Sequence, residues 1–205
     1  MQGRQFAALA FFYIMMKKLI FILLVAVVFG SCSKPTPKPV GYYRIEIPKN
    51  EYRTFADDAY PYQFQLSEYA QVKPRPDTKD DRYWIDIYYP QFDGTIYCSY
   101  KAVNNNFQEI TEDTREFVYK HTVKADDITE QPFVNDEKHV YGILYRLEGN
   151  TASPTQFILT DSVSYLFRGA LYFNAKPNKD SIAPVLDFIN ADIVRLVESF
   201  EMKKN

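Results

Sequence analysis

Between residues 43 and 174, apolar side chains recur at every second position in seven runs, and this period is the pattern of half-buried β-strands. The runs lie at residues 43–47, 62–66, 82–89, 95–103, 139–148, 155–160 and 163–174. Asp93-Gly94 and Gly149-Asn150 separate neighbouring runs and are typical of tight turns, so we expect antiparallel pairing. Residues 69–81 carry prolines and several charges, which predicts an exposed loop.

Two segments follow the helical period instead. Residues 107–123 would place an inner face of Phe107, Ile110, Phe117, Val118 and His121 on a helix. Residues 181–201 keep one apolar stripe for five turns, made of Ile182, Val185, Leu186, Ile189, Ile193, Leu196, Val197 and Phe200. Such stripes must pack against something. The chain is therefore predicted to form an α+β domain, with one antiparallel sheet of about seven strands packed by two helices.

The start of the chain has the three-part layout of a secretory signal. Lys17 and Lys18 precede an apolar run at 19–29, and two small residues then lead to Cys32. The apolar run is shorter than the roughly 20 residues of a membrane-spanning helix. We therefore predict a signal peptide over residues 1–31, with the true start at Met15 or Met16, and lipid attachment at Cys32. The alternative is an ordinary signal peptide followed by a coincidental cysteine, since Phe29 replaces the leucine usual three places before a lipidated cysteine.

Residues 32–40 are predicted to be the lipidated cysteine and a Pro-rich tether, because prolines at alternate positions favour an extended chain of about 3.1 Å per residue. Residues 41–203 are predicted to form a single globular domain. Removing residues 1–31 takes away three of the 24 basic residues and none of the 26 acidic ones, so the mature net charge is −5. That charge disfavours nucleic acid and anionic lipid as partners. Acidic residues just after the cysteine mark some surface-exported lipoproteins, whereas Lys34 and Pro35 stand near Cys32 here. This favours a domain that faces the periplasm, on either the inner or the outer membrane.

The sequence has few of the residue patterns that are typical of catalytic or metal-binding sites. His121 and His139 lie in different elements, and neither has the spacing of a metal site around it. No nucleophile motif or phosphate-binding glycine loop occurs. Cys98 is the one other cysteine, so no internal disulfide can form once Cys32 is lipidated, and its place in an alternating run predicts a buried, inert thiol. We therefore predict no metal, no cofactor and no enzymatic activity.

Aromatic residues are unusually frequent. Tyrosine dominates, with 17 residues in the chain. Several aromatic residues occupy the strand faces opposite the more apolar set, namely Tyr42, Trp84, Tyr88, Tyr97 and Tyr172. They either form an exposed protein or sugar interface, for which tyrosine and tryptophan are suited, or they lie under a second layer such as a helix.

Arg168 shares a strand face with Leu166, Ala170 and Tyr172. An arginine among apolar neighbours either pairs with a buried acid or binds a partner's carboxylate. The candidate partner-binding residues are therefore Trp84, Tyr88, Arg168 and Tyr172.

Several blocks of the chain resemble a known family, the gliding motility lipoprotein GldD of the Bacteroidota. The blocks are Cys32 with residues 37–45, Tyr83-Trp84-Ile85-Asp86, residues 159–162, residues 166–173 and residues 180–185. The resemblance implies an envelope lipoprotein required for gliding and associated with the type IX secretion machinery, with no biochemical act assigned to it. The order of strands and helices also resembles the layered sandwich of PsbP-like domains.

Three functional hypotheses follow. The leading one is a lipid-anchored, non-enzymatic binding or assembly component of the envelope motility and secretion machinery, which would contact other envelope proteins. The alternative is a carrier or hydrolase for envelope glycans or lipids that uses the aromatic residues as a platform, and which would need a deep pocket with converging acids. The third is a structural stabiliser without an exposed site.

Overall fold

The computed structural model describes residues 13, 15–20, 46–75, 82–120, 125–174 and 179–203. Contacts divide the chain into two units, Met1–Tyr42 and Tyr43–Asn205. In the first unit, residues 13 and 15–20 are helical and exposed. The predicted lipid-attachment residue Cys32, the tether at 32–40, Tyr42 and His121 lie outside the described residues.

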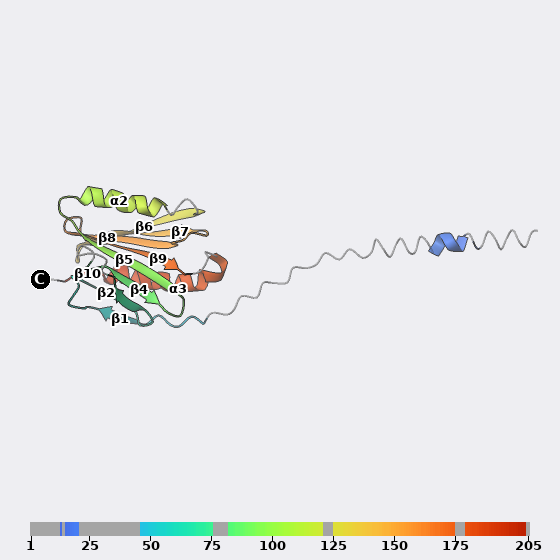
Figure 1. Ribbon diagram of the computed structural model, residues 1–205, viewed down its shortest axis with the longest axis horizontal. Coiled ribbons are helices and arrows are strands. Elements are labelled where there is room, and N and C mark those ends of the chain that lie inside the picture. Colours follow the sequence, from blue (N-terminus) through green and yellow to red (C-terminus); the bar gives the residue numbers. More distant parts are fainter. Residues whose placement is uncertain are drawn as a thin grey trace, which may run out of the picture. The chain divides into compact units, whose positions relative to one another are not determined.

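A seven-stranded antiparallel sheet is the centre of the second unit (Figure 1). Its strand order is β3-β4-β5-β9-β8-β7-β6, so the two long strands β5 and β9 pair near the middle. The strands are β3 (Gln71–Pro74), β4 (Ile85–Tyr89), β5 (Gly94–Ala102), β6 (Asp127–Asn135), β7 (Val140–Glu148), β8 (Thr155–Thr160) and β9 (Tyr165–Phe173). The α+β class and the sheet of seven antiparallel strands are thereby confirmed.

The membership of the sheet differs from the prediction at four places. The run at 62–66 is strand β2 (Tyr62–Ser67), which pairs with β1 (Tyr52–Phe55) and β10 (Glu201–Met202) in a separate three-stranded sheet. At 43–47, residues 46 and 47 are not in a strand, and the rest lies outside the described residues. β3 begins inside the segment predicted to be a loop, and β6 was not predicted at all.

The two predicted helices are present and lie on opposite faces of the large sheet (Figure 1). They are α2 (Phe107–Lys120) and α3 (Lys179–Ser199). On one face, here called the inner face, α3 and the small sheet enclose the larger core cluster. On the other, the outer face, α2 contributes Ile110 and Val118 to a smaller cluster over β7, β8 and β9. The layers are therefore small sheet with α3, large sheet, and α2.

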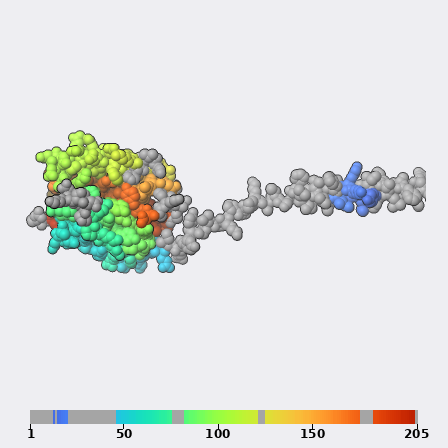
Figure 2. All heavy atoms as spheres, viewed as in Figure 1, coloured from blue at the N-terminus to red at the C-terminus, as the bar shows by residue number. Residues whose placement is uncertain are grey.

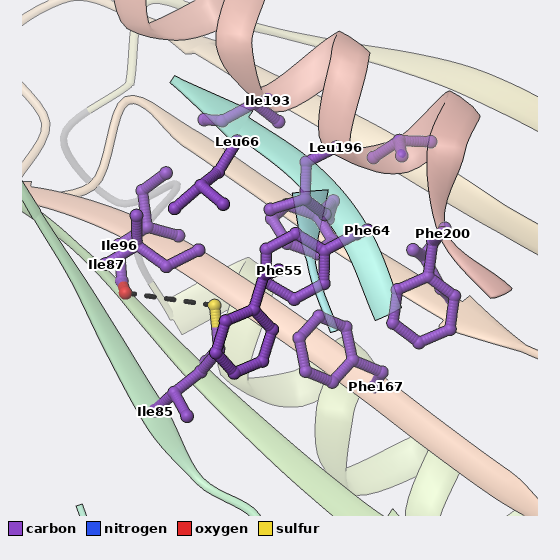
Figure 3. Close-up of a cluster of buried hydrophobic side chains, with 14 of the residues drawn as sticks. Phe55, Phe64, Leu66, Ile85, Ile87, Ile96, Phe167, Ile193, Leu196 and Phe200 are labelled. Atoms are coloured by element: carbon purple, nitrogen blue, oxygen red, sulfur yellow. Dashed lines mark hydrogen bonds between the residues drawn. The ribbon is translucent and has the colours of Figure 1, made fainter. Parts of the chain in front are cut away.

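Aromatic rings fill the inner core (Figure 3). The Phe167 ring lies 4.9 Å from both the Tyr62 and the Phe200 ring centroids, and all three residues are fully buried. Each such side chain contributes about 1.5–3 kcal/mol on burial. Cys98 also lies here with no exposed surface, and burial raises the pKa of its thiol, which confirms the predicted buried, inert cysteine.

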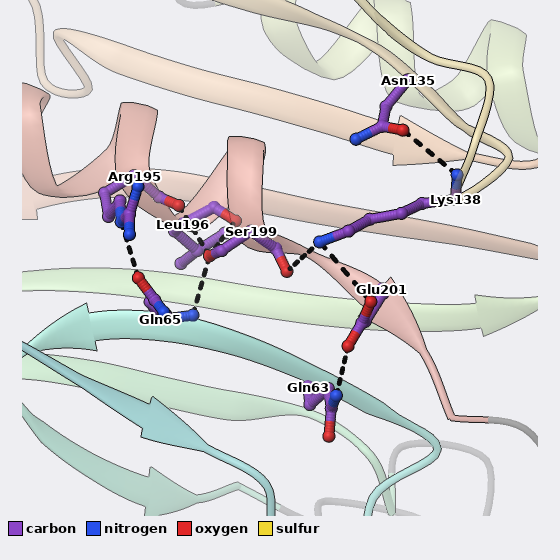
Figure 4. Close-up of polar contacts among 8 residues, drawn as sticks. All are labelled: Gln63, Gln65, Asn135, Lys138, Arg195, Leu196, Ser199 and Glu201. Carbon is purple, nitrogen blue, oxygen red and sulfur yellow. Dashed lines mark hydrogen bonds and ion pairs between the residues drawn. The ribbon is translucent and has the colours of Figure 1, made fainter.

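Polar contacts fix the C-terminal end of α3 to its surroundings (Figure 4). Arg195 Nε donates to the side-chain oxygen Oε1 of Gln65 at 2.6 Å, and the backbone N–H of Gln65 donates to Ser199 Oγ at 2.8 Å. Lys138 Nζ donates to the Ser199 carbonyl at 3.2 Å, where a cation opposes the negative end of the helix dipole. These contacts join α3 to β2 and to the turn between β6 and β7.

Candidate functional site

Strand register places the predicted partner-binding residues on one face. Arg168 faces Ser99, and Tyr172 faces Thr95, which in turn faces Tyr88 on β4. Trp84 directly precedes β4, one residue before the pair Ile85–Cys98. All of these side chains alternate with the buried inner set, so they belong to the outer face, the side on which α2 packs.

Helix α2 covers only part of this outer face. Its buried residues are Ile110, Thr114 and Val118, which pack toward β7, β8 and the start of β9. In Figure 2, orange atoms of the later strands are visible between the yellow-green atoms of α2 and the green atoms of β4 and β5. One part of the outer face therefore lies under a helix and another is open, and Trp84, Tyr88, Tyr97 and Tyr172 are not members of the cluster under α2.

A cavity of about 380 Å³ lies where the helix leaves the sheet open. It is lined by Arg75, Trp84, Tyr97, Ser99, Phe117, Arg168, Ala170 and Tyr172. Three of the four candidate partner-binding residues, Trp84, Arg168 and Tyr172, thus line one cavity. Tyr88 is not part of the lining, and its ring instead lies 4.2 Å from Lys73 Nζ.

Arg168 is the most constrained polar group of this cavity. Its Cζ atom lies 3.7 Å from the centroid of the Phe117 ring, so the guanidinium is held by a cation–π contact. Its Nε is buried and has no hydrogen-bond acceptor among the described residues. Burial lowers the pKa of the guanidinium, and the nearby Tyr172 opposes that shift. No described carboxylate forms an ion pair with Arg168, so the buried-acid interpretation finds no support in this part of the chain.

Arg75 supplies a second cation. Its Nε lies 3.2 Å from Asp86 Oδ1, and its Cζ lies 5.2 Å from the Trp84 ring and 5.1 Å from the Tyr97 ring. The Trp84 indole is fixed from its other end, because Nε1 donates to the Tyr100 carbonyl at 3.0 Å. One wall of the cavity is therefore held in place before any ligand arrives.

Sequence reasoning missed two of the lining residues. Arg75 lies in the segment predicted to be a loop, and Phe117 was assigned to the inner face of its helix. Phe117 is 40% exposed, and its ring points toward Arg168 instead of joining the cluster under α2. The helical period of residues 107–123 gives no sign of this, since Phe117 lies seven residues after the buried Ile110 and so falls on almost the same side of the helix.

Two more cavities continue the first one along α2 and make a groove. One of about 240 Å³ shares Ser99, Phe117 and Arg168 with it and adds Lys101 and Asp113. The next, of about 360 Å³, is lined in part by Trp84, Lys101, Glu109 and Asp113. Arg75 therefore lines only the first cavity and the exposed Glu109 only the third, whereas Arg168 and the exposed Asp113 both line the second.

Catalytic constellations are not found in the described part of the chain. Among those residues, no group of three or more His, Cys, Asp and Glu side chains could hold a metal ion. Of the two cavities that Arg168 lines, the one of about 380 Å³ has two arginines and no carboxylate among its described lining residues, and the one of about 240 Å³ has Asp113 as its one carboxylate. The described helices also include none with both the length and the apolar character required to cross a bilayer.

Over the described residues, the protein is an α+β domain with a groove on the outer face of its large sheet. The family model described as gliding motility lipoprotein GldD matches residues 32–202, starting at the predicted lipid-attachment residue. The chain belongs to this family, and is therefore a lipoprotein of the cell envelope associated with gliding motility.

No curated protein matches the chain. A similar solved structure is the cyanobacterial PsbP (CyanoP) of Synechocystis sp. PCC 6803, with a TM-score of 0.44 and 9% sequence identity, covering 81% of this chain and 100% of that one. The assignment of the fold rests on the strand order described above.

Proposed function

We propose that this lipoprotein is a non-enzymatic binding or assembly component for gliding motility and the associated type IX secretion machinery. In this proposal it faces the periplasm, is anchored by acyl chains on Cys32, and contacts a protein partner through the groove between α2 and strands β4, β5 and β9. The observation that carries the proposal is the buried Nε of Arg168, which has no described acceptor at the wall of an open cavity.

Arg168 is half-buried and its Nε has no described acceptor, which is costly for the isolated protein because this donor loses water without gaining a hydrogen bond. Arginine, tryptophan and tyrosine are also the residues most enriched at the energetic centres of protein interfaces. Arg168, Trp84 and Tyr172 are all in the lining of one cavity. A partner that supplied the missing acceptor would convert the cost of burial into binding energy.

The anchor has a direct test. Replacing Cys32 by Ala removes the acceptor thiol, so we expect a soluble precursor without acyl groups in place of a membrane-bound protein. Metabolic labelling with palmitate and membrane fractionation measure both properties. Replacement of Ser33 by Ala is the matched control and should leave labelling intact. A labelled, membrane-bound Cys32→Ala protein would show that the anchor lies elsewhere.

The binding role is tested by cross-linking in intact cells. A photoreactive amino acid at position 97, at the rim of the cavity, should give adducts with motility or secretion components, because Tyr97 is 40% exposed and lines the groove. The same group at Val134, which is 65% exposed on β6 of the opposite edge, is the control. Equal adduct patterns from both positions, or none from position 97, would count against the groove as the contact surface.

The alternative function is a carrier or hydrolase for envelope glycans or lipids. The aromatic lining of the cavity, with Trp84, Tyr97 and Tyr172, is the observation in its favour. A hydrolase would need two converging acids, whereas the described lining of this cavity has none. Release of products from purified envelope glycan by the acylated protein would support the alternative and overturn the non-enzymatic role.

A further inference from the structure

We propose that the groove binds an extended peptide segment of a partner protein, with one acidic side chain inserted against Arg168. This inference rests on the proposed function, since it specifies the chemistry of the partner at the same groove. The bound segment would carry a single carboxylate, flanked by uncharged or basic residues.

The geometry of Arg168 selects a carboxylate. Its Cζ lies over the Phe117 ring, 3.7 Å from the centroid, so Phe117 covers one side of the guanidinium. A planar fork of donors matches the two oxygens of a carboxylate, in bidentate geometry, better than any neutral group. The buried Nε has no acceptor in the described structure, so the hydrogen bonding of the guanidinium is incomplete, and a carboxylate in the cavity would pair with its terminal N–H groups.

The walls of the cavity increase the strength of such a pair. The Tyr97 and Tyr172 rings contact each other edge to face, with centroids 5.6 Å apart. These rings and Trp84 line the cavity together with Arg168 and would exclude water from the bound carboxylate. An ion pair that is shielded from water is stronger than the same pair at an open surface. The volume of about 380 Å³ accommodates an acidic side chain with adjoining backbone.

A peptide fits the groove better than a sugar does. Sugar rings bind by stacking on free aromatic faces, but the Arg75 guanidinium already lies over the Trp84 and Tyr97 rings, at 5.2 and 5.1 Å. The groove also continues along α2 through two further cavities, which suits an extended chain.

Charge along the groove restricts the peptide further. Asp113 lines the second cavity together with Arg168 and Lys101, and it lines the third cavity together with Glu109 and Lys101. The two carboxylates outnumber the one cation in the lining of the third cavity, so an acidic run would be repelled there. A segment with one acid at the arginine end, followed by neutral or basic residues, complements both ends. This charge pattern is what separates a specific peptide from general attraction to anions.

The test uses the full acylated protein in neutral detergent micelles. Trp84 is the single tryptophan of the chain and lies in the cavity wall, so its fluorescence reports binding at this site. The probes are three capped octapeptides built on a Gly-Ser-Lys background: one with a central Asp, one with Asn in its place, and one with four consecutive Asp residues. We expect the single-Asp peptide to bind at least tenfold more tightly than the Asn peptide, which lacks the charge-assisted hydrogen bond. It should also bind more tightly than the four-Asp peptide, which Glu109 and Asp113 repel.

Variants of the protein separate recognition from folding. Arg168→Gln should weaken the single-Asp peptide about tenfold or more, and Arg168→Lys should restore part of the affinity, because a charge without the planar fork remains. Arg115→Gln is the matched control: it lies on the exposed side of α2, near the Tyr119 ring and outside the groove lining. A thermal melt of each variant checks that the fold is retained.

Three results would overturn the inference. They are equal binding of the Asp and Asn peptides, an unchanged affinity in Arg168→Gln, and binding of sodium glucuronate in place of any peptide. The proposed function fails separately, when position 97 gives no adducts with envelope proteins in cells. If position 97 does cross-link to such proteins while the Asp and Asn peptides bind alike, then the groove is the contact surface but a carboxylate is not what it recognises.

Discussion

The two faces of the large sheet are covered by helices of different lengths and with different completeness. On the inner face, the 21-residue α3 and the small sheet enclose a continuous core, and polar contacts at Arg195, Ser199 and Lys138 hold the end of the helix (Figure 4). On the outer face, the 14-residue α2 buries three residues and leaves a groove beside β5 and β9. The inner face thus provides most of the stability, which allows the outer face to keep an unpaired arginine.

The largest expected difference between the faces concerns a single ring on each. Phe167→Ala removes a fully buried ring at the centre of the inner core and should lower the free energy of unfolding by about 3–5 kcal/mol. Tyr97→Ala removes a ring that is 40% exposed on the paired strand, and should cost about 1 kcal/mol or less. Urea denaturation followed by circular dichroism measures both. Similar losses for the two variants would contradict the division of roles.

A smaller effect is expected from adding one methyl group to each face. A Cβ at Gly142 would lie 2.1 Å from the Ile158 carbonyl oxygen, and this backbone atom cannot move without disturbing the pairing of β7 with β8. We expect Gly142→Ala to cost about 1–3 kcal/mol. Ser99→Thr adds a methyl group within the outer cavity and should change stability by less than about 0.5 kcal/mol. Paired thermal melts decide this, and a tolerated Gly142→Ala would show that the inner layers are packed less closely than described.

Much of the difference between the faces is readable in the sequence. Strands β4, β5, β7, β8 and β9 and both helices follow from apolar period, because these elements bury one full side. β6 does not, because it is an edge strand with mostly exposed residues and with Pro132 in its interior. β2 alternates as clearly as the central strands do, and its period alone does not tell which of the two sheets it joins.

The groove is only half predictable for a related reason. Period two places Trp84, Arg168 and Tyr172 on one face, and strand pairing then brings them together. Arg75 and Phe117 come from outside those strands, and only the packing of α2 and the short strand β3 places them against Arg168. Which polar groups lack a partner is a property of this packing, so the strongest indication of function could not be derived from the sequence.

A pH dependence should belong to the inner face. Asp192 on α3 is 2% exposed and accepts hydrogen bonds from Asn50 Nδ2 at 2.8 Å and from Tyr89 OH at 3.1 Å. Burial raises the pKa of its carboxyl above the ordinary value, although these hydrogen bonds lower it in part. The folded state therefore keeps this proton at pH values where the unfolded chain has lost it.

The protonated Asp192 carboxyl adds to the free energy of unfolding. This stabilisation is fully present below the pKa of the group in the unfolded chain, about 3.9, and is lost as the pH rises through its pKa in the folded protein. Asp192→Asn cannot ionise, so the free energy of unfolding of the wild type relative to this variant should fall as the pH rises from about 4 to 7. Urea denaturation across this range measures the difference. Asp187→Asn on the same helix is the control, and a difference that is constant or rising with pH would show that the carboxyl is ionised in the fold.

The smallest expected change in stability is at Arg168, and its sign separates a binding residue from a structural one. Arg168→Met replaces a desolvated guanidinium that has no described carboxylate partner by an apolar chain of similar length, so the free energy of unfolding should stay equal or rise by up to about 1 kcal/mol. The lost contact with Phe117 limits the gain. Arg115→Met, on the exposed side of α2, should change nothing. If Arg168→Met instead lowered the free energy of unfolding by more than about 2 kcal/mol, Arg168 would stabilise the fold as Phe167 does. Its position would then have a structural explanation that requires no binding partner.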